Sequence, residues 1–346
     1  MRGLVFHAVG DVRMEDVPDA RLVEPTDAVV QTVAACVCGS DLWWYRDAST
    51  KAAGSRCGHE LIGTVTEVGA EVRDIRPGDF VIVPFCYSCG FCPECRAGVT
   101  SACRNGGAIG GANGDGGQGE AVRVPWADGS LKVVPGGRPA DDGVLASLLT
   151  LSDVFPTGHH AAVTAGVRPG STVAVVGDGA VGLLGVLAAA RLGADRIIAL
   201  SRHPDRQALA RRFGATDIVA ERGREATAAV RELTDGVGAD AVLECVGLDE
   251  SMQTAFRIAR AGADVGYVGV PHGVQVPVGY NFSRNIGLRG GVAPVRTYLD
   301  ELLPEVLEGA VEPGLVFDLR LPFERFADGY AAMTERRAVK AWAVAG

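Results

Sequence analysis

The sequence lacks an excess of basic residues and any long apolar run, and these absences exclude two classes of partner. Its 33 Lys and Arg are outnumbered by 42 Asp and Glu, which gives a formal net charge of −9. A surface of that sign repels nucleic-acid phosphates and anionic lipid headgroups. The longest Gly/Ala-rich apolar stretch, residues 179–190, falls short of the roughly 20 residues that span a membrane. We therefore expect no nucleic-acid and no membrane partner.

The N-terminal residues also lack the pattern of a secretion signal, because no long apolar core precedes a small-residue cleavage site. A cytoplasmic location is the resulting expectation, and thiols stay reduced there. Five of the nine cysteines fall between Cys86 and Cys103, which in a reducing compartment favours metal binding over disulfides. The ordinary globular composition excludes wholesale disorder, and 346 residues suffice for two domains or one large one.

The pattern of apolar residues and turn residues changes near residue 170. Before that point, short β-like runs broken by Gly, Pro and Asp predict a barrel-like or irregular β domain: 28–34, 63–68, 80–84, 121–124 and 132–134. After it, apolar β-branched runs alternate with helical patterns, which predicts a parallel sheet covered on both faces. The predicted strands are 172–177, 196–200, 217–220, 241–245 and 264–270, with helices at 180–192, 204–213, 225–234 and 250–261.

The last 55 or so residues need a sheet to join. They carry a predicted helix at 294–308 and short strands at 317–321 and 340–344. A return to the N-terminal β domain makes the doubly wound domain an insertion. The predicted boundaries are 1–150, 151–289 and 290–346.

A glycine fingerprint lies between a predicted strand and a predicted helix. Residues 177–182 read Gly-Asp-Gly-Ala-Val-Gly, which is G-x-G-x-x-G. The first glycine permits the tight turn, the second lets backbone approach a pyrophosphate, and the third packs helix on strand. The helix N-terminus offers N–H groups to the phosphates. The motif predicts dinucleotide binding, although glycine-rich turns of other α/β proteins can imitate it.

The residues after the second strand of this domain bear on the choice of dinucleotide. An NAD-preferring site places a carboxylate there, about 20 residues on, to bind the ribose 2′-hydroxyl. Here Ser201 and Arg202 follow the strand, and a guanidinium can meet a 2′-phosphate with charge-assisted hydrogen bonds. NADP(H) is favoured over NAD(H); the alternative is that Arg202 is simply solvated.

Four cysteines share one short loop with the spacing C-x2-C-x2-C-x7-C: Cys89, Cys92, Cys95 and Cys103. Their thiolates can close a tetrahedral zinc site with no open position for chemistry. An iron–sulfur cluster competes for this spacing, and four free thiols are the remaining alternative. Structural zinc is the favoured interpretation.

A second set of metal-binding side chains is spread through the chain. The thiol of Cys38, the imidazole of His59 and the carboxylate of Asp153 suit a catalytic zinc with one open position. From spacing alone, a structural His59 and a helix-capping Asp153 are the commoner explanations.

The sequence resembles the zinc-containing medium-chain dehydrogenase/reductase family of the alcohol dehydrogenase type over essentially its whole length. Five motifs stand in the family's order: Cys-Gly-Ser-Asp at 38–41, Gly-His-Glu at 58–60, Arg-Pro-Gly-Asp at 76–79, the cysteine loop at 89–103 and the fingerprint at 177–182. The resemblance implies an α/β architecture, with an N-terminal GroES-like β-barrel catalytic domain and a doubly wound Rossmann cofactor domain. It also implies a homodimer or homotetramer, formed through edge strands of the cofactor domain.

The resemblance implies that Cys38, His59 and Asp153 hold the catalytic zinc. The third ligand is Cys in many members and Asp in a branch similar to bacterial secondary alcohol dehydrogenases. Glu60 is implied as a carboxylate that approaches the metal when water or substrate exchanges. Asp41 is implied to orient His59 by a hydrogen bond, as metal-bound imidazoles generally require.

The proton route departs from the family's pattern. Ser40 is implied to hydrogen-bond the substrate oxygen and pass its proton onward. Many members then have a His a few residues after the catalytic Cys, but Trp43 stands there and cannot titrate. Trp43 and Phe85 are interpreted as walls of an apolar pocket, which favours a hydrophobic substrate. Trp44 and Tyr45 fit core packing equally well.

The resemblance places Thr157 near the nicotinamide and Lys340 near the cofactor phosphates, although Lys340 can also be an ordinary exposed lysine. The nearby His159 and His160 are interpreted as structural. The full set of cofactor-binding residues is Thr157, Gly177, Gly179, Ala180, Val181, Gly182, Ser201, Arg202, Val246, Gly269, Val270 and Lys340.

The implied function is hydride transfer between NADP(H), less readily NAD(H), and a small-molecule alcohol/carbonyl pair, with two zinc ions per chain. A zinc-independent enone or quinone reductase and a non-catalytic protein that retains the fold are alternatives, and the intact set Cys38, His59 and Asp153 argues against both. A zinc-ribbon module for nucleic acid is opposed by the net charge of −9.

Overall fold

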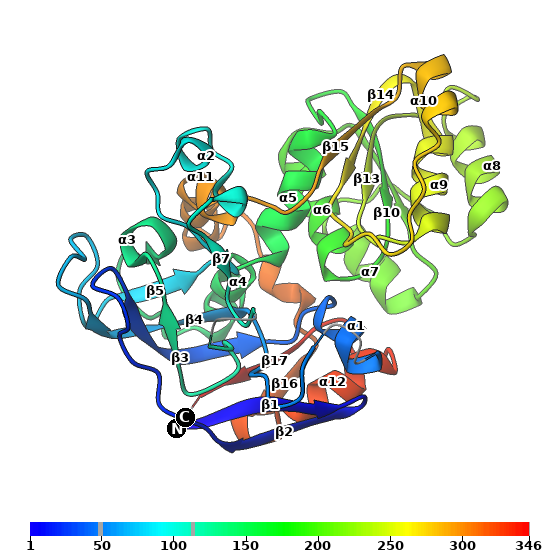
Figure 1. Cartoon of the computed structure of the whole chain (residues 1–346). Helices are drawn as coiled ribbons and strands as arrows, with labels where there is room; N and C mark the ends of the chain where they lie inside the picture. The colour runs from blue at the N-terminus through cyan, green and yellow to red at the C-terminus, as the bar shows by residue number, and fades with distance from the viewer. Residues whose placement is uncertain (48–50, 112–114, 346) are drawn as a thin grey trace. The chain divides into compact units, whose positions relative to one another are not determined.

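The structure, a computed structural model, describes residues 1–47, 51–111 and 115–345. The chain divides into two compact units (Figure 1). The first joins Met1–Pro156 to Pro294–Gly346, and the second is Thr157–Ala293. The C-terminal segment therefore returns to the unit that the N-terminal segment begins.

The first unit is built on a seven-stranded sheet in the order β16-β17-β3-β4-β5-β9, with β8 paired to β3. The return segment enters this sheet directly, because β17 pairs antiparallel with β3 and sets Trp342 opposite Cys36. The strands are β3 (Ala28–Cys36), β4 (Glu60–Val68), β5 (Phe80–Val83), β8 (Ala121–Val124), β9 (Lys132–Val133), β16 (Leu319–Pro322) and β17 (Ala341–Val344), beside the pairs β1 (Arg2–Ala8) with β2 (Asp11–Asp16) and β6 (Cys86–Tyr87) with β7 (Gly107–Ala108).

Alternating apolar residues explain why these strands form one core. Val30, Leu61 and Val81 come from three neighbouring strands and are all buried in the same cluster. Helices of the unit are short except where they pack on the sheet or on each other. They are α1 (Asp41–Arg46), α2 (Pro93–Arg96), α3 (Ala127–Ser130), α4 (Asp142–Thr150), α11 (Val295–Leu307) and α12 (Ala327–Thr334), while α5 (Val154–Thr164) runs on into the second unit.

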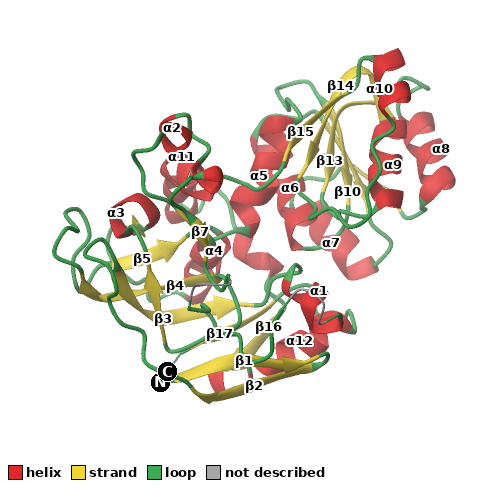
Figure 2. Ribbon diagram, viewed as in Figure 1, coloured by secondary structure: helices red, strands yellow, loops and turns green. Residues whose placement is uncertain are grey.

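The second unit is a six-stranded parallel sheet in the order β12-β11-β10-β13-β14-β15. Helices cover both faces of the sheet (Figure 2). The elements are β10 (Thr172–Val176), α6 (Ala180–Arg191), β11 (Arg196–Leu200), α7 (Pro204–Arg212), β12 (Asp217–Val219), α8 (Gly223–Leu233), β13 (Ala239–Glu244), α9 (Asp249–Ile258), β14 (Ala259–Tyr267), α10 (Val278–Arg284) and β15 (Gly287–Gly290).

The order of the strands reverses direction at one point of the sheet. The chain winds outward from β10 in one direction through β11 and β12, then crosses to β13 and winds the other way. In open parallel sheets, ligands bind beyond the carboxyl ends of the strands at such a switch point. The glycine turn after β10 lies at this end. The predicted α/β fold class, a GroES-like β domain with a doubly wound domain, is confirmed.

In the described part of the chain, no helix is both long and apolar enough to cross a membrane.

Candidate zinc sites and cofactor-binding turn

The four cysteines of the loop converge on one point. Cys92 Sγ lies 3.4 Å from Cys95 Sγ and 3.7 Å from Cys103 Sγ, and Cys103 Sγ lies 3.6 Å from Cys89 Sγ. Four thiolates about 2.3 Å from a tetrahedral zinc would be separated by about 3.8 Å, so the donor set fits this ion. The short helix α2 and the turn Thr100–Ala102 bring the last three cysteines back onto Cys89.

Hydrogen bonds to sulfur favour the thiolate form of Cys89 in this loop. The Asn105 amide and the backbone N–H of Cys89 donate to Cys89 Sγ and Cys103 Sγ, respectively. Burial raises the pKa of Cys89, but the Asn105 amide and backbone N–H groups outweigh it and lower the pKa to about 6. An anionic sulfur is the form that binds zinc.

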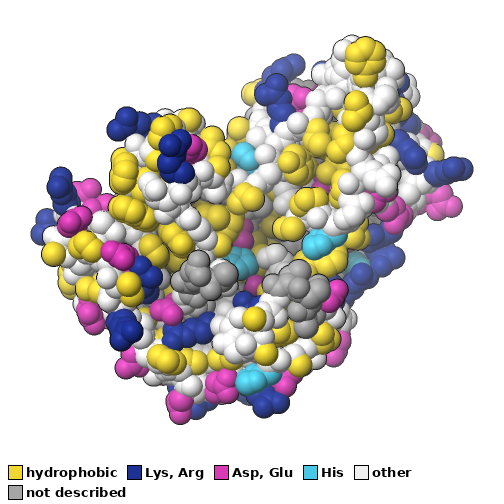
Figure 3. Space-filling view, viewed as in Figure 1, with side chains coloured by type: hydrophobic (Ala, Val, Ile, Leu, Met, Phe, Trp, Pro, Cys, Tyr) yellow, Lys and Arg dark blue, Asp and Glu magenta, His cyan; other side chains and the backbone are white. Residues whose placement is uncertain are grey.

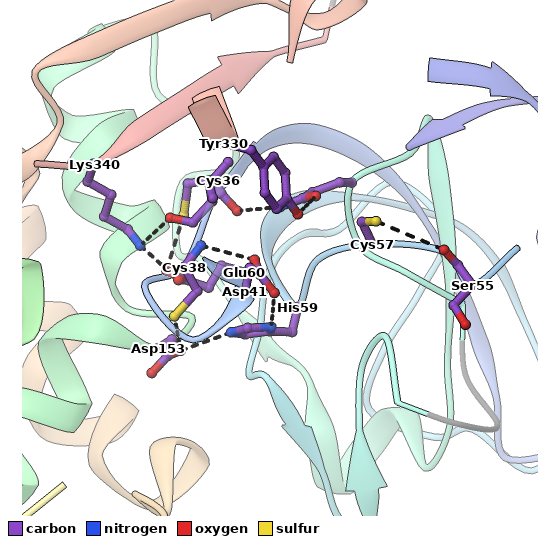
Figure 4. Close-up of polar contacts among 12 residues, drawn as sticks. Cys36, Cys38, Asp41, Ser55, Cys57, His59, Glu60, Asp153, Tyr330 and Lys340 are labelled. Atoms are coloured by element: carbon purple, nitrogen blue, oxygen red, sulfur yellow. Dashed lines mark hydrogen bonds and ion pairs between the residues drawn. The ribbon is translucent and has the colours of Figure 1, made fainter. Parts of the chain in front are cut away.

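A second cluster joins Cys38, His59 and Asp153, with Glu60 beside them (Figure 4). Cys38 follows β3, His59 directly precedes β4, and Asp153 directly precedes α5. Asp153 Oδ2 lies 3.4 Å from His59 Nε2 and 3.7 Å from Cys38 Sγ. Burial and the carboxylates of Glu60 and Asp153 raise the pKa of the Cys38 thiol to about 11. A cation among these groups would offset that repulsion, so this donor set also fits zinc.

Asp41 ties two members of this cluster together. One carboxylate oxygen lies 3.5 Å from His59 Nδ1, and the other accepts a hydrogen bond from the Cys38 backbone N–H at 3.1 Å. The His59 ring is thereby oriented with Nε2 toward Asp153. Orientation of this kind is what a carboxylate behind a metal-binding imidazole supplies.

Glu60 and Lys340 form an ion pair within the protein interior. Lys340 Nζ donates to Glu60 Oε1 at 2.8 Å and to the Val37 carbonyl at 3.1 Å, while Cys36 Sγ donates to Glu60 Oε2 at 3.1 Å (Figure 4). Burial lowers the pKa of Lys340, but the charge and hydrogen bond of the Glu60 carboxylate outweigh it and raise the pKa above its ordinary value.

The expectation for Lys340 is therefore corrected. The residue is buried, and its ammonium donates hydrogen bonds to Glu60 and to the Val37 carbonyl. It is neither an ordinary exposed lysine nor, in this conformation, a cation open to a phosphate. β17 explains the difference, because its pairing with β3 carries the preceding residue, Lys340, to the inner side of the cluster.

The four aromatic residues considered in the sequence analysis have different surroundings. The Phe85 ring lies edge-on to His59 with centroids 6.0 Å apart, and Trp43 is half-buried on α1. Trp44 and Tyr45 instead pack on Tyr330, each with ring centroids 5.3 Å apart. These two residues are partly buried and pack against the core of the first unit. Ser40 stands at the start of α1, and its hydroxyl makes no capping hydrogen bond there.

The glycine turn has the geometry that each glycine predicts. Gly177 has φ of +116°, a left-handed value that other residues rarely adopt. A Cβ on Gly182 would lie 2.0 Å from the Gly177 carbonyl oxygen, whereas one on Gly179 would meet nothing within 4 Å. The third glycine thus serves helix packing, and the second leaves room for a phosphate. Ala180 and Val181 open α6 directly after it.

The other predicted cofactor residues of this unit flank the carboxyl ends of the same sheet. Val246 follows β13 and lies against Gly177, where an added Cβ would approach Val246 Cγ2 to 2.7 Å. Gly269 and Val270 follow β14, and Val270 is exposed. Thr157 is buried on α5.

Two charged residues that contact each other beside Ser201, Asp178 after β10 and Arg206 on α7, escaped the sequence analysis. Ser201 is buried and donates a hydrogen bond to Asp178 Oδ2 at 3.0 Å, and Arg206 Nη1 lies 3.3 Å from Asp178 Oδ1. Arg202 is exposed. The sequence offered one signal for this contact: Asp178 is an acidic residue inside the glycine fingerprint, at a position where the motif allows any residue.

Two family models match the chain: the alcohol dehydrogenase GroES-like domain over residues 24–135 and the zinc-binding dehydrogenase over residues 180–308. The chain is 35% identical over 340 residues to zinc-type alcohol dehydrogenase B of Aspergillus flavus, covering 95% of this chain and 78% of that protein. An alcohol dehydrogenase structure from Thermus sp. ATN1 has a TM-score of 0.93 at 33% identity over 99% of both chains. A structure of an NAD-dependent alcohol dehydrogenase has a TM-score of 0.85 at 26% identity over all of both chains.

The fold and these likenesses define an oxidoreductase of the alcohol dehydrogenase type. The chain belongs to the zinc-containing alcohol dehydrogenase family of medium-chain dehydrogenases/reductases. Zinc and a nicotinamide dinucleotide are the cofactors of this family, and its substrates are small molecules.

Proposed function

We propose that the chain transfers hydride between NADP(H), less readily NAD(H), and a secondary or hydrophobic alcohol and its ketone or aldehyde. Cys38, His59 and Asp153 would hold the catalytic zinc, with Glu60 as a transient ligand. The observation that carries this proposal is the convergence of three donor atoms, because Asp153 Oδ2 lies 3.4 Å from His59 Nε2 and 3.7 Å from Cys38 Sγ. Three protein donors leave a fourth position open for an alcohol or carbonyl oxygen.

When bound, the zinc supplies Lewis acidity toward that oxygen, and the nicotinamide supplies or accepts the hydride. The residues of the chain orient and protect the reacting groups. Asp41 fixes the His59 ring, and the Ser40 hydroxyl can donate a hydrogen bond to the substrate oxygen and pass its proton onward. Phe85, edge-on to His59, excludes water beside the cluster and, with Trp43, favours an apolar substituent on the substrate.

A second zinc ion would be held by Cys89, Cys92, Cys95 and Cys103. Four protein sulfurs leave no open position, so this ion would stabilise the loop and take no part in hydride transfer. The proposed stoichiometry is two zinc ions per chain.

The proposed preference for NADP(H) is supported by the residues that follow β11. Ser201 is neutral, and the exposed Arg202 can reach a 2′-phosphate with charge-assisted hydrogen bonds. Thr157 and the carboxyl ends of β13 and β14, with Val246, Gly269 and Val270, would receive the nicotinamide half.

We also propose a homo-oligomer, dimer or tetramer, and a cytoplasmic location. β15 ends the six-stranded sheet, so its outer edge presents backbone donors and acceptors that a strand of a second copy can pair with. None of the nine cysteines, all of which lie in the described part of the chain, forms a disulfide, as is usual in a reducing compartment.

Replacing Asp153 tests the catalytic site. In Asp153→Ala we expect zinc to fall from two to one per chain, and turnover to fall roughly a thousandfold, since several kcal/mol of charge stabilisation are lost. NADPH binding should persist. Elemental analysis of dialysed protein gives the zinc content, and a screen of alcohols and carbonyls with NADPH and NADH gives turnover.

The matched control is Asp16→Ala, which removes an exposed acid from β2 of the same unit. It should keep two zinc ions and full turnover. Unchanged turnover in Asp153→Ala would refute the ligand assignment. One zinc in the unmodified protein, retained in Cys38→Ala, would leave only the cysteine loop occupied and favour the zinc-independent reductase.

A further inference from the structure

The glycine turn carries a carboxylate that the dinucleotide fingerprint does not require. Asp178 stands between Gly177 and Gly179, after the central strand β10. Its Oδ2 accepts a hydrogen bond from Ser201 Oγ at 3.0 Å, and its side chain is only 13% exposed. The Asp178 carboxylate therefore connects the turn after β10 to Ser201, the first residue after the neighbouring strand β11.

The first residue after the second strand has a known role in dinucleotide-binding sheets, where it contacts the adenosine ribose. When NAD(H) is preferred, the residue after the second strand is acidic, and its carboxylate accepts hydrogen bonds from the ribose hydroxyls. If residue 201 were acidic, its side chain would extend from the place that the Ser201 hydroxyl now occupies. Asp178 brings the same chemical group into hydrogen-bond contact with that position from the neighbouring turn.

Arg206 binds the same carboxylate from the first turn of α7. Its Nη1 lies 3.3 Å from Asp178 Oδ1 and 3.2 Å from the Asp178 carbonyl oxygen, and the guanidinium side chain is 15% exposed. The region beyond the carboxyl ends of β10 and β11 therefore contains the Asp178 carboxylate, the Arg206 guanidinium paired with it, and the exposed Arg202. Each carboxylate oxygen has a further acceptor site, so Asp178 can bind hydroxyl groups without releasing Ser201 or Arg206.

We propose that Asp178 is a residue that determines cofactor specificity. Its carboxylate accepts hydrogen bonds from the adenosine ribose hydroxyls, which makes NAD(H) usable, and it repels a 2′-phosphate. Arg206 partly neutralises that repulsion, and Arg202 attracts the phosphate. This inference rests on the proposed function, and it predicts that preference for NADP(H) is weaker than the two arginines alone would give.

Nucleotide fragments test this without reference to turnover. Isothermal titration calorimetry on the full chain would give dissociation constants for 5′-AMP and for adenosine 2′,5′-bisphosphate, which differ only by the 2′-phosphate. In Asp178→Asn, which keeps the shape of the side chain, we expect the ratio of the two constants to shift toward the bisphosphate by roughly tenfold or more. 5′-AMP should bind no tighter than to the unmodified protein, because an acceptor for its hydroxyls is weakened.

A second variant has the opposite sign. Arg206→Gln leaves the Asp178 charge without its partner, so the ratio should shift toward 5′-AMP. The control is Asp195→Asn, which removes an equal charge from an exposed acid at the other end of β11 and should shift the ratio less than about twofold. A purely structural role of the pair would instead weaken both ligands alike in both variants.

The outcomes separate the inference from the proposed function. Tighter binding of 5′-AMP than of the bisphosphate to the unmodified protein would refute the NADP(H) preference, while a shift in Asp178→Asn would still support the role of Asp178. An unchanged ratio in Asp178→Asn and Arg206→Gln would overturn the inference, whichever fragment the unmodified protein prefers. If Asp178→Asn does not fold, the direction of the shift in Arg206→Gln decides.

Discussion

At the scale of single residues, the ion pair of Glu60 and Lys340 is one whose removal has a calculable energetic consequence. The two side chains are 0% and 1% exposed, so both charges have been removed from water. Desolvation of this kind is offset only while both partners and their further hydrogen bonds are present, here from Cys36 and to the Val37 carbonyl. The pair stands directly behind the cluster of Cys38, His59 and Asp153.

Removal of one partner should therefore cost more than removal of both. Lys340→Met leaves a buried carboxylate uncompensated, and we expect the free energy of unfolding to fall by about 3–5 kcal/mol. The double variant Lys340→Met with Glu60→Gln removes the charge and should regain most of that loss. Urea unfolding of the two variants measures the difference; a double variant no more stable than the single one would contradict this account.

Two of the three residues proposed to hold the catalytic zinc, Cys38 and His59, could be predicted from the sequence because they stand in recognisable motifs, whereas Asp153 stands in none of these motifs. Cys38 and His59 each precede or follow a strand by one or two residues, and their motifs name them. No such motif announces that Lys340 reaches Glu60, which is 280 positions away along the chain. That contact depends on the pairing of β17 with β3, a tertiary event that local sequence does not encode.

At the scale of elements, the turn from β10 into α6 contains two glycines with different roles. Gly182 allows helix α6 to pack closely on the turn, and Gly179 leaves space for a ligand. An alanine at Gly182 would press its Cβ to 2.0 Å from the Gly177 carbonyl oxygen, and helix α6 would have to move off the strand. At Gly179, φ is −77° and no atom lies within 4 Å of the added Cβ. The same substitution three positions apart therefore has different consequences.

We expect Gly182→Ala to lower the free energy of unfolding by roughly 2–3 kcal/mol, the cost of overpacking a close contact. Gly179→Ala should leave unfolding unchanged within about 0.5 kcal/mol but weaken NADPH binding at least tenfold, since the methyl group occupies the phosphate's approach. Chemical denaturation and NADPH fluorescence titration measure the two effects. Equal destabilisation by both variants would show that the two glycines do not divide these roles.

The buried parallel strands were the elements best predicted from sequence. β10, β11 and β13 are nearly continuous apolar runs, because helices cover both of their faces. The edge of the sheet was missed. β15 reads Gly-Leu-Arg-Gly, with little intrinsic strand propensity, and is held in place by its pairing with β14. β14 itself begins at Ala259, inside the segment predicted as helix 250–261, next to an irregularity in its pairing with β13.

At the scale of the whole molecule, the second unit presents apolar side chains beside its open sheet edge. Hydrophobic side chains gather over α10 in the space-filling view (Figure 3). Val278 is 71% exposed and Phe282 85% exposed on α10, and Val292, two residues beyond β15, is 59% exposed. A second copy of the chain would cover these side chains while pairing its own β15 with this one. Such a two-fold contact is self-complementary, as closed dimers require.

Replacing the most exposed aromatic side chain of that surface should weaken the assembly. In Phe282→Asp a charge would be buried in an apolar contact, and we expect the dissociation constant of the dimer to rise about a hundredfold or more. The control is Val23→Asp, which places the same charge on a residue of the first unit that is 61% exposed. Sedimentation velocity over a range of protein concentrations distinguishes monomer, dimer and tetramer. A monomeric unmodified protein at micromolar concentration would refute the oligomer, whereas a Phe282→Asp variant that still dimerises would place the contact elsewhere on the chain.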